Sequence, residues 1–111
     1  KAKKAIIPDS ITKGGVRYKV TSVAADAFSG CKKLKEVMIG KNIKTIGKNC
    51  FKNCHSLKKI NIRSKIFRKA GKNSLKGTNK KLIVSCNKKK MTKYKKLLKN
   101  RGNNKYKMKE K

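Results

Sequence analysis

The amino-acid sequence predicts a solenoid, a stack of short structural repeats that share one hydrophobic core. The first observation is the motif F-x-x-C-x-x-L, which occurs at residues 28–34 and again at 51–57, 23 residues further on. The second is that the apolar positions around the motif also match, and that a third, degenerate copy follows. The third is the period itself, because repeats of 20–50 residues are typical of stacked architectures.

The repeat is a set of aligned columns rather than a single motif. Residues 23–46, 46–70 and 70–86 form three units, and the second interval is one residue longer than the first. The third unit departs from the pattern at Leu75, Thr78 and Lys81. The columns that we expect in the core are Phe28, Phe51 and Leu75; Cys31 and Cys54; Leu34 and Leu57; Val37, Ile60 and Val84; and Ile39, Ile62 and Cys86.

Each unit is expected to contain a strand, because apolar and polar residues alternate after the motif. In residues 36–39 the inward positions would be Val37 and Ile39, and residues 59–62 and 82–86 repeat the pattern. Alternation over this length indicates a half-buried strand. Stacked units would then form a parallel sheet, with neighbouring strands about 4.8 Å apart.

Each unit also contains a second extended stretch and a turn. The extended stretch in residues 42–47 ends at the column that opens each unit, which is formed by Val23, Ile46 and Ala70. Short acceptors stand two positions before the large apolar residue, where they could cap a helical turn, and these are Asp26, Asn49 and Asn73. Residues that tolerate the left-handed end of a helix follow at Gly30, Asn53 and Gly77. We therefore expect one capped helical turn in each unit.

The two ends of the chain fit a capped stack. Residues 5–23 contain a partial unit and a hairpin around Gly14-Gly15, which could close the first edge of the sheet. Residues 88–101 are expected to form a closing helix, because apolar residues recur there at helical spacing: Met91, Tyr94, Leu97 and Leu98. We expect one solenoid domain over residues 1–102 and a flexible tail over 103–111, where no apolar period exists.

These residues resemble a known family. The unit A-F-x-G-C-x-x-L-x-x-V-x-I-G-x-N-I-x-x-I-G is similar to the BspA-type leucine-rich repeat of bacterial surface proteins, and so are IPDSI at 7–11 and IGKNIKTIG at 39–47. The resemblance covers residues 5–102. It implies a leucine-rich repeat solenoid, an α/β and β-rich fold, on a secreted or cell-surface bacterial protein that serves adhesion or recognition rather than catalysis. We expect the chain to be the C-terminal part of a longer exported protein.

Lysine dominates the charged residues. Lys and Arg number 35 against 4 acidic residues, which gives a formal net charge of +31, and apolar residues make up 36% of the chain. This composition is typical of disorder, but apolar residues that fall into register from unit to unit indicate a packed core. A field of this sign attracts polyanions, so an anionic glycan or wall polymer is an expected partner.

Nucleic acid is the alternative partner of such a basic chain. Two observations argue against specific recognition. The cations are 31 Lys and only 4 Arg, whereas base edges are best recognised by the bidentate guanidinium group. Aromatic residues make up only 5%, and Phe28 and Phe51 are assigned to the core, so no stacking platform remains. Any binding to nucleic acid would be non-specific.

The sequence shows no catalytic or metal-binding constellation. The C-x₃-C pair at 50 and 54 has no second pair of ligands, as a zinc site requires. We expect Cys31, Cys54 and Cys86 to be small buried core residues, with disulfide pairing as the alternative. His55, the single histidine, occupies a column that should face solvent, and no third residue would orient it. We therefore expect no enzyme, no metal and no cofactor.

The function that we predict is a non-catalytic interaction or adhesion module, without membrane insertion and monomeric. Its partner would be an extracellular or host protein, or a polyanion. A structural spacer that presents other domains is a further alternative. The binding surface is expected on the outward strand positions, because a sheet face is regular, and these positions are Glu36, Met38, Lys59 and Asn61.

Overall fold

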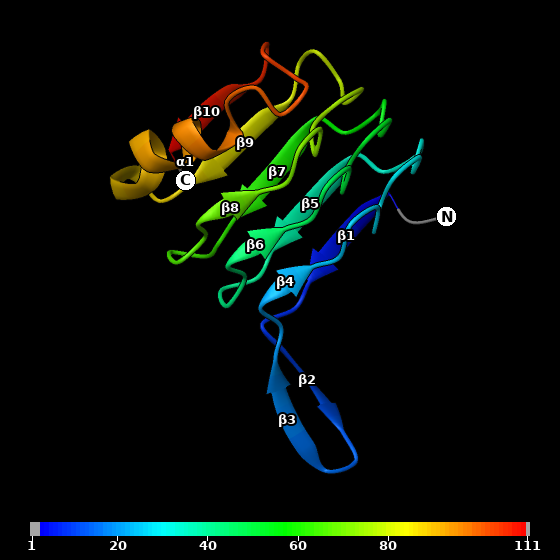
Figure 1. The fold of residues 1–111 in the computed structure, drawn as a ribbon, viewed down its shortest axis with the longest axis vertical. Coiled ribbons are helices and arrows are strands. Elements are labelled where there is room, and N and C mark those ends of the chain that lie inside the picture. Colours follow the sequence, from blue (N-terminus) through cyan, green and yellow to red (C-terminus); the bar gives the residue numbers. More distant parts are fainter. Residues whose placement is uncertain (1–2, 111) are drawn as a thin grey trace.

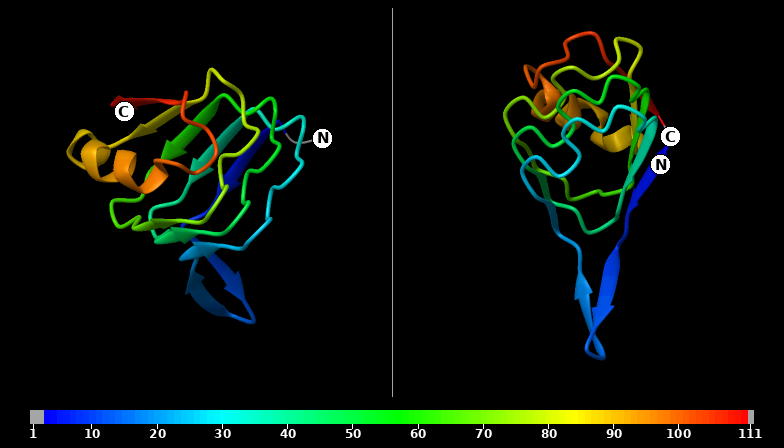
Figure 2. Two further views of the ribbon diagram at one scale, coloured as in Figure 1. Left: turned by 45° about the horizontal axis from the view of Figure 1, so that its top comes forward. Right: turned by 90° about the vertical axis from the view of Figure 1, so that its right-hand side faces the viewer.

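The strands of successive units stack into two parallel sheets on opposite sides of the core (Figures 1 and 2). The computed structural model describes residues 3–110; residues 1, 2 and 111, which the predicted domain and tail include, lie outside them. The main sheet has the order β1 (Lys4–Ile7), β5 (Glu36–Ile39), β7 (Lys59–Ile62), β9 (Ile83–Cys86) and β10 (Lys107–Glu110). The small sheet consists of β4 (Ser22–Val23), β6 (Thr45–Ile46) and β8 (Lys69–Ala70).

The register of both sheets confirms the predicted columns. In the main sheet Val37 lies between Ala5 and Ile60, and Ile60 in turn lies opposite Val84. In the small sheet the column that opens each unit is continuous, because Val23 pairs with Ile46 and Ile46 with Ala70. Like residues therefore lie above one another, which is the arrangement that a leucine-rich repeat solenoid requires.

The turns differ from the predicted capped helical turn. Asp26, Asn49 and Asn73 have positive φ values of 61°, 57° and 59°, so the predicted N-cap role is wrong for them. Two of these residues instead form backbone hydrogen bonds to the next unit. The Asp26 N–H donates to the Lys48 carbonyl at 2.9 Å, and the Asn49 N–H donates to the Lys72 carbonyl at 3.0 Å. Asp and Asn tolerate this left-handed conformation better than most residues do. The second set of turn residues behaves as predicted, since Gly30, Asn53 and Gly77 also have positive φ.

The hairpin forms as predicted but does not close the sheet. It pairs β2 (Ser10–Lys13) with β3 (Val16–Lys19) in antiparallel fashion, and Gly14 and Gly15 adopt φ values of 58° and 78° at its turn. This turn requires positive φ at both positions, which glycine accepts without strain. The hairpin is inserted in the connection between β1 and β4, and it projects away from the solenoid (Figure 1). Strand β1 remains the outer strand of the main sheet.

The closing helix caps the core. A 3₁₀ turn at Lys88–Lys90 leads into α1 (Met91–Leu98), where Tyr94 and Leu98 are buried. The Tyr94 hydroxyl donates to the Ser64 carbonyl at 2.7 Å, and its ring meets that of Phe67 edge-on, with centroids 5.4 Å apart. Phe67, which lies in the longer second unit and was not assigned to the core from sequence, is fully buried.

The predicted flexible tail is instead ordered over residues 103–110. Asn103 is buried, and its side-chain amide donates to Thr78 Oγ1 at 2.8 Å and to the Asn79 carbonyl at 3.1 Å. Its Oδ1 accepts from the backbone N–H groups of Lys105 and Tyr106. These bonds direct the chain into β10, which pairs in parallel with β9. A strand at the end of a sheet needs few apolar residues, which is why the composition concealed it.

Candidate interaction surface

The outer face of the main sheet presents two rows of side chains, because alternate residues of each strand point away from the core. The strand register aligns both rows across all five strands. The first row consists of Lys4, Glu36, Lys59, Ile83 and Lys107. The second row consists of Ile6, Met38, Asn61, Ser85 and Lys109.

The structure brings the four predicted binding residues together. Glu36 pairs in register with Lys59, and Met38 with Asn61. Glu36 and Met38 are partly exposed and Lys59 is exposed. The Glu36 carboxylate lies 3.8 Å from the Lys4 ammonium group, a solvent-exposed ion pair that contributes little to stability.

Asn61 is the exception among these residues. Its side chain was expected to be available to a partner, but only 5% of the residue is exposed. The short amide lies in a central strand between Met38 and Ser85, which flank it at the usual strand spacing. Its Oδ1 atom accepts no hydrogen bond from the described residues.

The second row is uncharged over four strands, in a chain with 35 cationic residues. Ile6 is 61% exposed, and in the neighbouring row Ile83 is 37% exposed. Sequence reasoning missed Ile6, Ile83 and Ser85. The sequence held a signal for Ile6, because IPDSI at 7–11 corresponds to the start of IGKNIKTIG at 39–47. This correspondence places Ile6 beside Met38.

The predicted core is buried with two exceptions. Phe28 is half-buried and Cys31 is exposed, so the core assignment of Cys31 is wrong. Both lie in the first unit, where no earlier unit of the described chain covers them. The remaining predicted core residues are all buried: Leu34, Val37, Ile39, Phe51, Cys54, Leu57, Ile60, Ile62, Leu75, Val84 and Cys86.

The cysteines are free thiols, and burial sets the chemistry of three of them. Desolvation raises the pKa of Cys50 to about 12 and that of Cys54 to about 11, and it also raises the pKa of Cys86. The Cys54 thiol donates to the Phe28 carbonyl at 3.0 Å. A thiol held in its protonated form is a poor nucleophile and a poor metal ligand.

The side chains of residues 3–110 form no cluster suited to holding a metal ion, since no group of three or more His, Cys, Asp or Glu side chains in this range could do so. His55 is exposed, and its backbone carbonyl accepts a hydrogen bond from the Asn79 side-chain amide at 3.1 Å. Within the same range, no helix is both long and apolar enough to cross a membrane.

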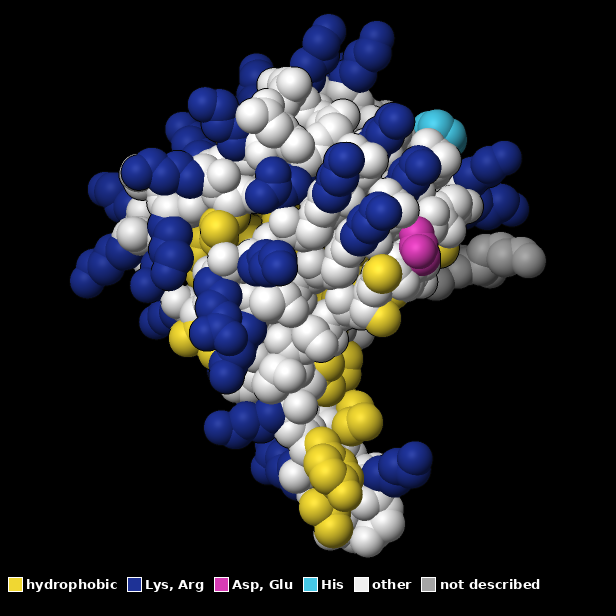
Figure 3. Space-filling view, viewed as in Figure 1, with side chains coloured by type: hydrophobic (Ala, Val, Ile, Leu, Met, Phe, Trp, Pro, Cys, Tyr) yellow, Lys and Arg dark blue, Asp and Glu magenta, His cyan; other side chains and the backbone are white. Residues whose placement is uncertain are grey.

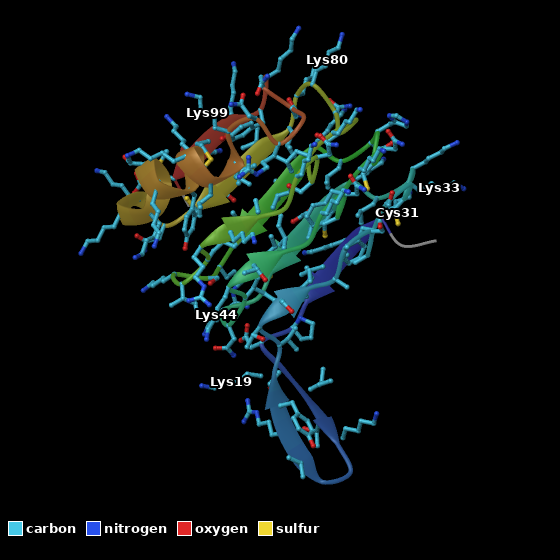
Figure 4. The ribbon with its side chains drawn as sticks, viewed as in Figure 1. Lys19, Cys31, Lys33, Lys44, Lys80 and Lys99 are labelled. Carbon is cyan, nitrogen blue, oxygen red and sulfur yellow. The ribbon has the colours of Figure 1, made fainter. Side chains whose placement is uncertain are left out.

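A basic groove lies at the other end of the stack, between α1 and β10. Its volume is about 640 Å³, within the size range of ligand pockets. Lys95, Lys99 and Lys107 line it with Tyr106 and Met108. Lys99, which follows the last residue of α1, is labelled in Figure 4.

A solenoid of stacked parallel strands with a regular outer face defines a repeat scaffold of the leucine-rich repeat class. The family described as "BspA type Leucine rich repeat region (6 copies)" matches residues 3–104. The chain therefore belongs to the BspA-type leucine-rich repeat family. Such repeats are in general non-enzymatic modules for protein interaction.

Solved structures agree with this assignment. A leucine rich cell surface protein from Faecalibacterium prausnitzii A2-165 is 28% identical with a TM-score of 0.68, over 75% of this chain and 23% of that one. A leucine-rich repeat protein from Bacteroides ovatus ATCC 8483 is 23% identical with a TM-score of 0.56, over 78% of this chain and 30% of that one, and shows the fold alone. The chain thus spans less than a third of either protein. Curated proteins gave no match.

Proposed function

We propose that the chain is a non-catalytic interaction module of an exported bacterial surface protein, and that the outer face of the main sheet binds an extracellular protein. The proposal rests on the four uncharged residues of the second row, which are Ile6, Met38, Asn61 and Ser85. Ile6 and Met38 lie side by side on β1 and β5, and both offer apolar surface to solvent. On a chain of net charge +31, a row without charge is the surface best suited to contacts that salt does not weaken.

The surface location of the Faecalibacterium protein supports export of this chain, by likeness of sequence and fold. The lysine residues supply a second, less selective interaction. They cover the face seen in Figure 3 and would hold polyanions such as sulfated glycans, wall polymers or nucleic acid. Binding of this kind releases counterions and therefore weakens steeply as salt increases.

The test compares these two kinds of binding. The double variant Ile6→Ser/Met38→Ser removes the apolar contacts of the second row and leaves the charge unchanged. Asn61 is left unchanged in this variant, because the residue is buried. Ile66→Ser is the matched control, since Ile66 is 47% exposed in the loop between β7 and β8. Binding to mucin, heparin and duplex DNA is measured for each protein across salt concentrations.

We expect heparin and DNA to dissociate as salt rises, equally for all three proteins. Mucin should retain a salt-resistant component that the double variant loses and that Ile66→Ser keeps. If binding to mucin collapses with salt in the same way as binding to heparin, and the double variant has no effect, the sheet face is not the binding surface for this glycoprotein. Binding to mucin would then rest on the charge of the lysine residues alone.

A further inference from the structure

The hairpin of β2 and β3 has one apolar and one polar face. Its register places Ile11 opposite Tyr18 and Val16 opposite Lys13, so Lys13 shares one face with three apolar residues, Ile11, Tyr18 and Val16. These three apolar residues are 51%, 52% and 50% exposed. On the other face Arg17 Nε donates to Ser10 Oγ at 3.0 Å. The hairpin is thus an amphipathic ribbon with its apolar face open to solvent.

This apolar face is unusual for the molecule. Six large apolar side chains are exposed among the described residues, and the hairpin contributes three of them. A two-stranded ribbon has no core of its own to hide such residues. Contiguous exposed apolar surface commonly marks a site of protein or membrane interaction.

The hairpin is held firmly at its base. The Asp9 carboxylate accepts a hydrogen bond from the Lys41 backbone N–H at 2.7 Å, and the Asp9 carbonyl accepts from Asn42 Nδ2 at 2.8 Å. The same carbonyl accepts from the Val20 backbone N–H at 3.0 Å. The bonds from Lys41 and Asn42 join the base of the hairpin to the unit that follows it, and the bond from Val20 closes the base itself.

The charge around this face restricts the partner. The charged residues of the two strands are all cations: Lys13, Arg17 and Lys19. A second copy of the chain carries the same charge, so electrostatic repulsion would oppose pairing of two hairpins.

Figure 3 shows one broad face of the molecule, with apolar side chains along the hairpin and Lys and Arg side chains over the body. The molecule measures 43 × 34 Å across this face and is 22 Å thick. The partner is therefore anionic and extended.

We propose that the hairpin docks on an anionic lipid bilayer, with Ile11, Val16 and Tyr18 in the interfacial region and the surrounding lysines on the headgroups. A fluid bilayer accommodates a flat ribbon without the shaped pocket that a protein partner needs around its anchor residues. Tyrosine suits this interface, because its ring is apolar and its hydroxyl stays hydrated. Apolar contact and basic charge are the two signals that peripheral binding combines.

The test places a reporter on the apolar face. The chain contains no Trp, so Tyr18→Trp introduces a single indole. Its fluorescence is followed with vesicles of phosphatidylcholine alone and of an equal mixture with phosphatidylglycerol. We expect a blue shift and quenching by brominated lipid with the mixed vesicles only. Ile66→Trp is the matched control, which should keep the emission of an indole in water.

A second variant measures the apolar contribution without changing the charge. Ile11→Ser/Val16→Ser should bind the mixed vesicles about tenfold more weakly than the native protein, since two half-exposed apolar side chains no longer leave water. Ile66→Ser should bind as the native protein does. Thermal melting verifies that each variant is folded, which we expect because neither hairpin position lies in the core.

Two results would overturn the proposal. In the first, Ile11→Ser/Val16→Ser binds the mixed vesicles as tightly as the native protein does, and the emission of Tyr18→Trp does not shift. Charge alone would then account for the binding. The other is a blue shift with poly-glutamate in solution and none with vesicles, which would assign the hairpin to an acidic protein partner.

Discussion

The first and second units have the same sequence columns but different environments. Phe51 and Cys54 of the second unit are completely buried, whereas their equivalents in the first unit, Phe28 and Cys31, are half-buried and exposed. The two phenyl rings stack with centroids 5.5 Å apart, so Phe28 forms one wall around Phe51. Burial of a residue in this fold therefore depends on whether a neighbouring unit covers it on each side, and not on the type of residue.

The backbone hydrogen bonds of the turns run in one direction along the stack. The Phe28 N–H donates to the Cys50 carbonyl at 2.9 Å, and the Phe51 N–H donates to the Ser74 carbonyl at 3.0 Å. In the third unit the Leu75 N–H donates to the Arg101 carbonyl at 2.8 Å, so the segment after α1 replaces a further unit. Each unit is stabilised by the one that follows it, and the C-terminal segment completes the series.

The largest effect is expected at Phe51. Phe51→Ala should lower the free energy of unfolding by roughly 3–5 kcal/mol, because it leaves a cavity between two neighbours. Phe28→Ala should cost only about 1–2 kcal/mol, since that ring is partly exposed and its loss opens the surface instead of enclosing a void. Urea unfolding of both variants measures the difference. Equal losses would mean that the first unit is as well packed as the second.

The columns predicted the interior of the stack well, because a repeated residue in a parallel stack contacts its own equivalents. The register of Val37, Ile60 and Val84 follows from this rule. Exposure at the first unit could not be predicted, because Cys31 and Cys54 look the same in an alignment of columns. The direction of the hairpin could not be predicted either, since Gly14-Gly15 specifies a turn and not the angle at its base.

The candidate surface was predicted only in part. Strand alternation gives the side of the sheet on which a residue lies, and it placed Glu36, Met38 and Lys59 correctly on the outer face. Strand alternation does not show how far the neighbouring side chains extend from the sheet, and these side chains bury Asn61. Strand β10 was also missed. The hydrogen bonds of Asn103 direct the chain into this strand, and a search for periodic apolar residues does not detect such bonds.

A second, smaller effect should appear in alkaline solution. The pKa of the buried Cys50 thiol is raised to about 12, so above pH 9 this thiol ionises in the unfolded chain before it ionises in the folded one. The unfolded state then binds fewer protons, and stability falls as pH rises through this window. One such thiol accounts for up to about 2 kcal/mol by about pH 10.5.

The measurement that isolates this thiol is the difference between native protein and Cys50→Ala. The substitution lowers the free energy of unfolding by an amount that does not depend on pH, because the loss comes from packing. The lysines titrate alike in both proteins and do not affect the difference. We therefore expect the stability gap between the two proteins to narrow as pH rises from 8 to about 10.5. A gap that stays constant would mean that the thiol is accessible enough to ionise in the folded state.

The smallest effect is expected from modification of Cys31, and it distinguishes the two units directly. Cys31 is exposed at the open end of the stack, whereas Cys50, Cys54 and Cys86 are buried and the Cys54 thiol is also engaged with the Phe28 carbonyl. A maleimide should therefore label one thiol per folded chain rapidly at neutral pH, and all four only after denaturation. Mass spectrometry should locate the rapid label on Cys31, and the melting temperature of the labelled protein should be unchanged, because no packed neighbour is displaced. Rapid labelling of Cys54 together with Cys31 would show that the first unit opens readily. Phe28 would then protect the second unit less than its stacking on Phe51 indicates. Slow labelling of Cys31 would show instead that something covers the first unit in solution.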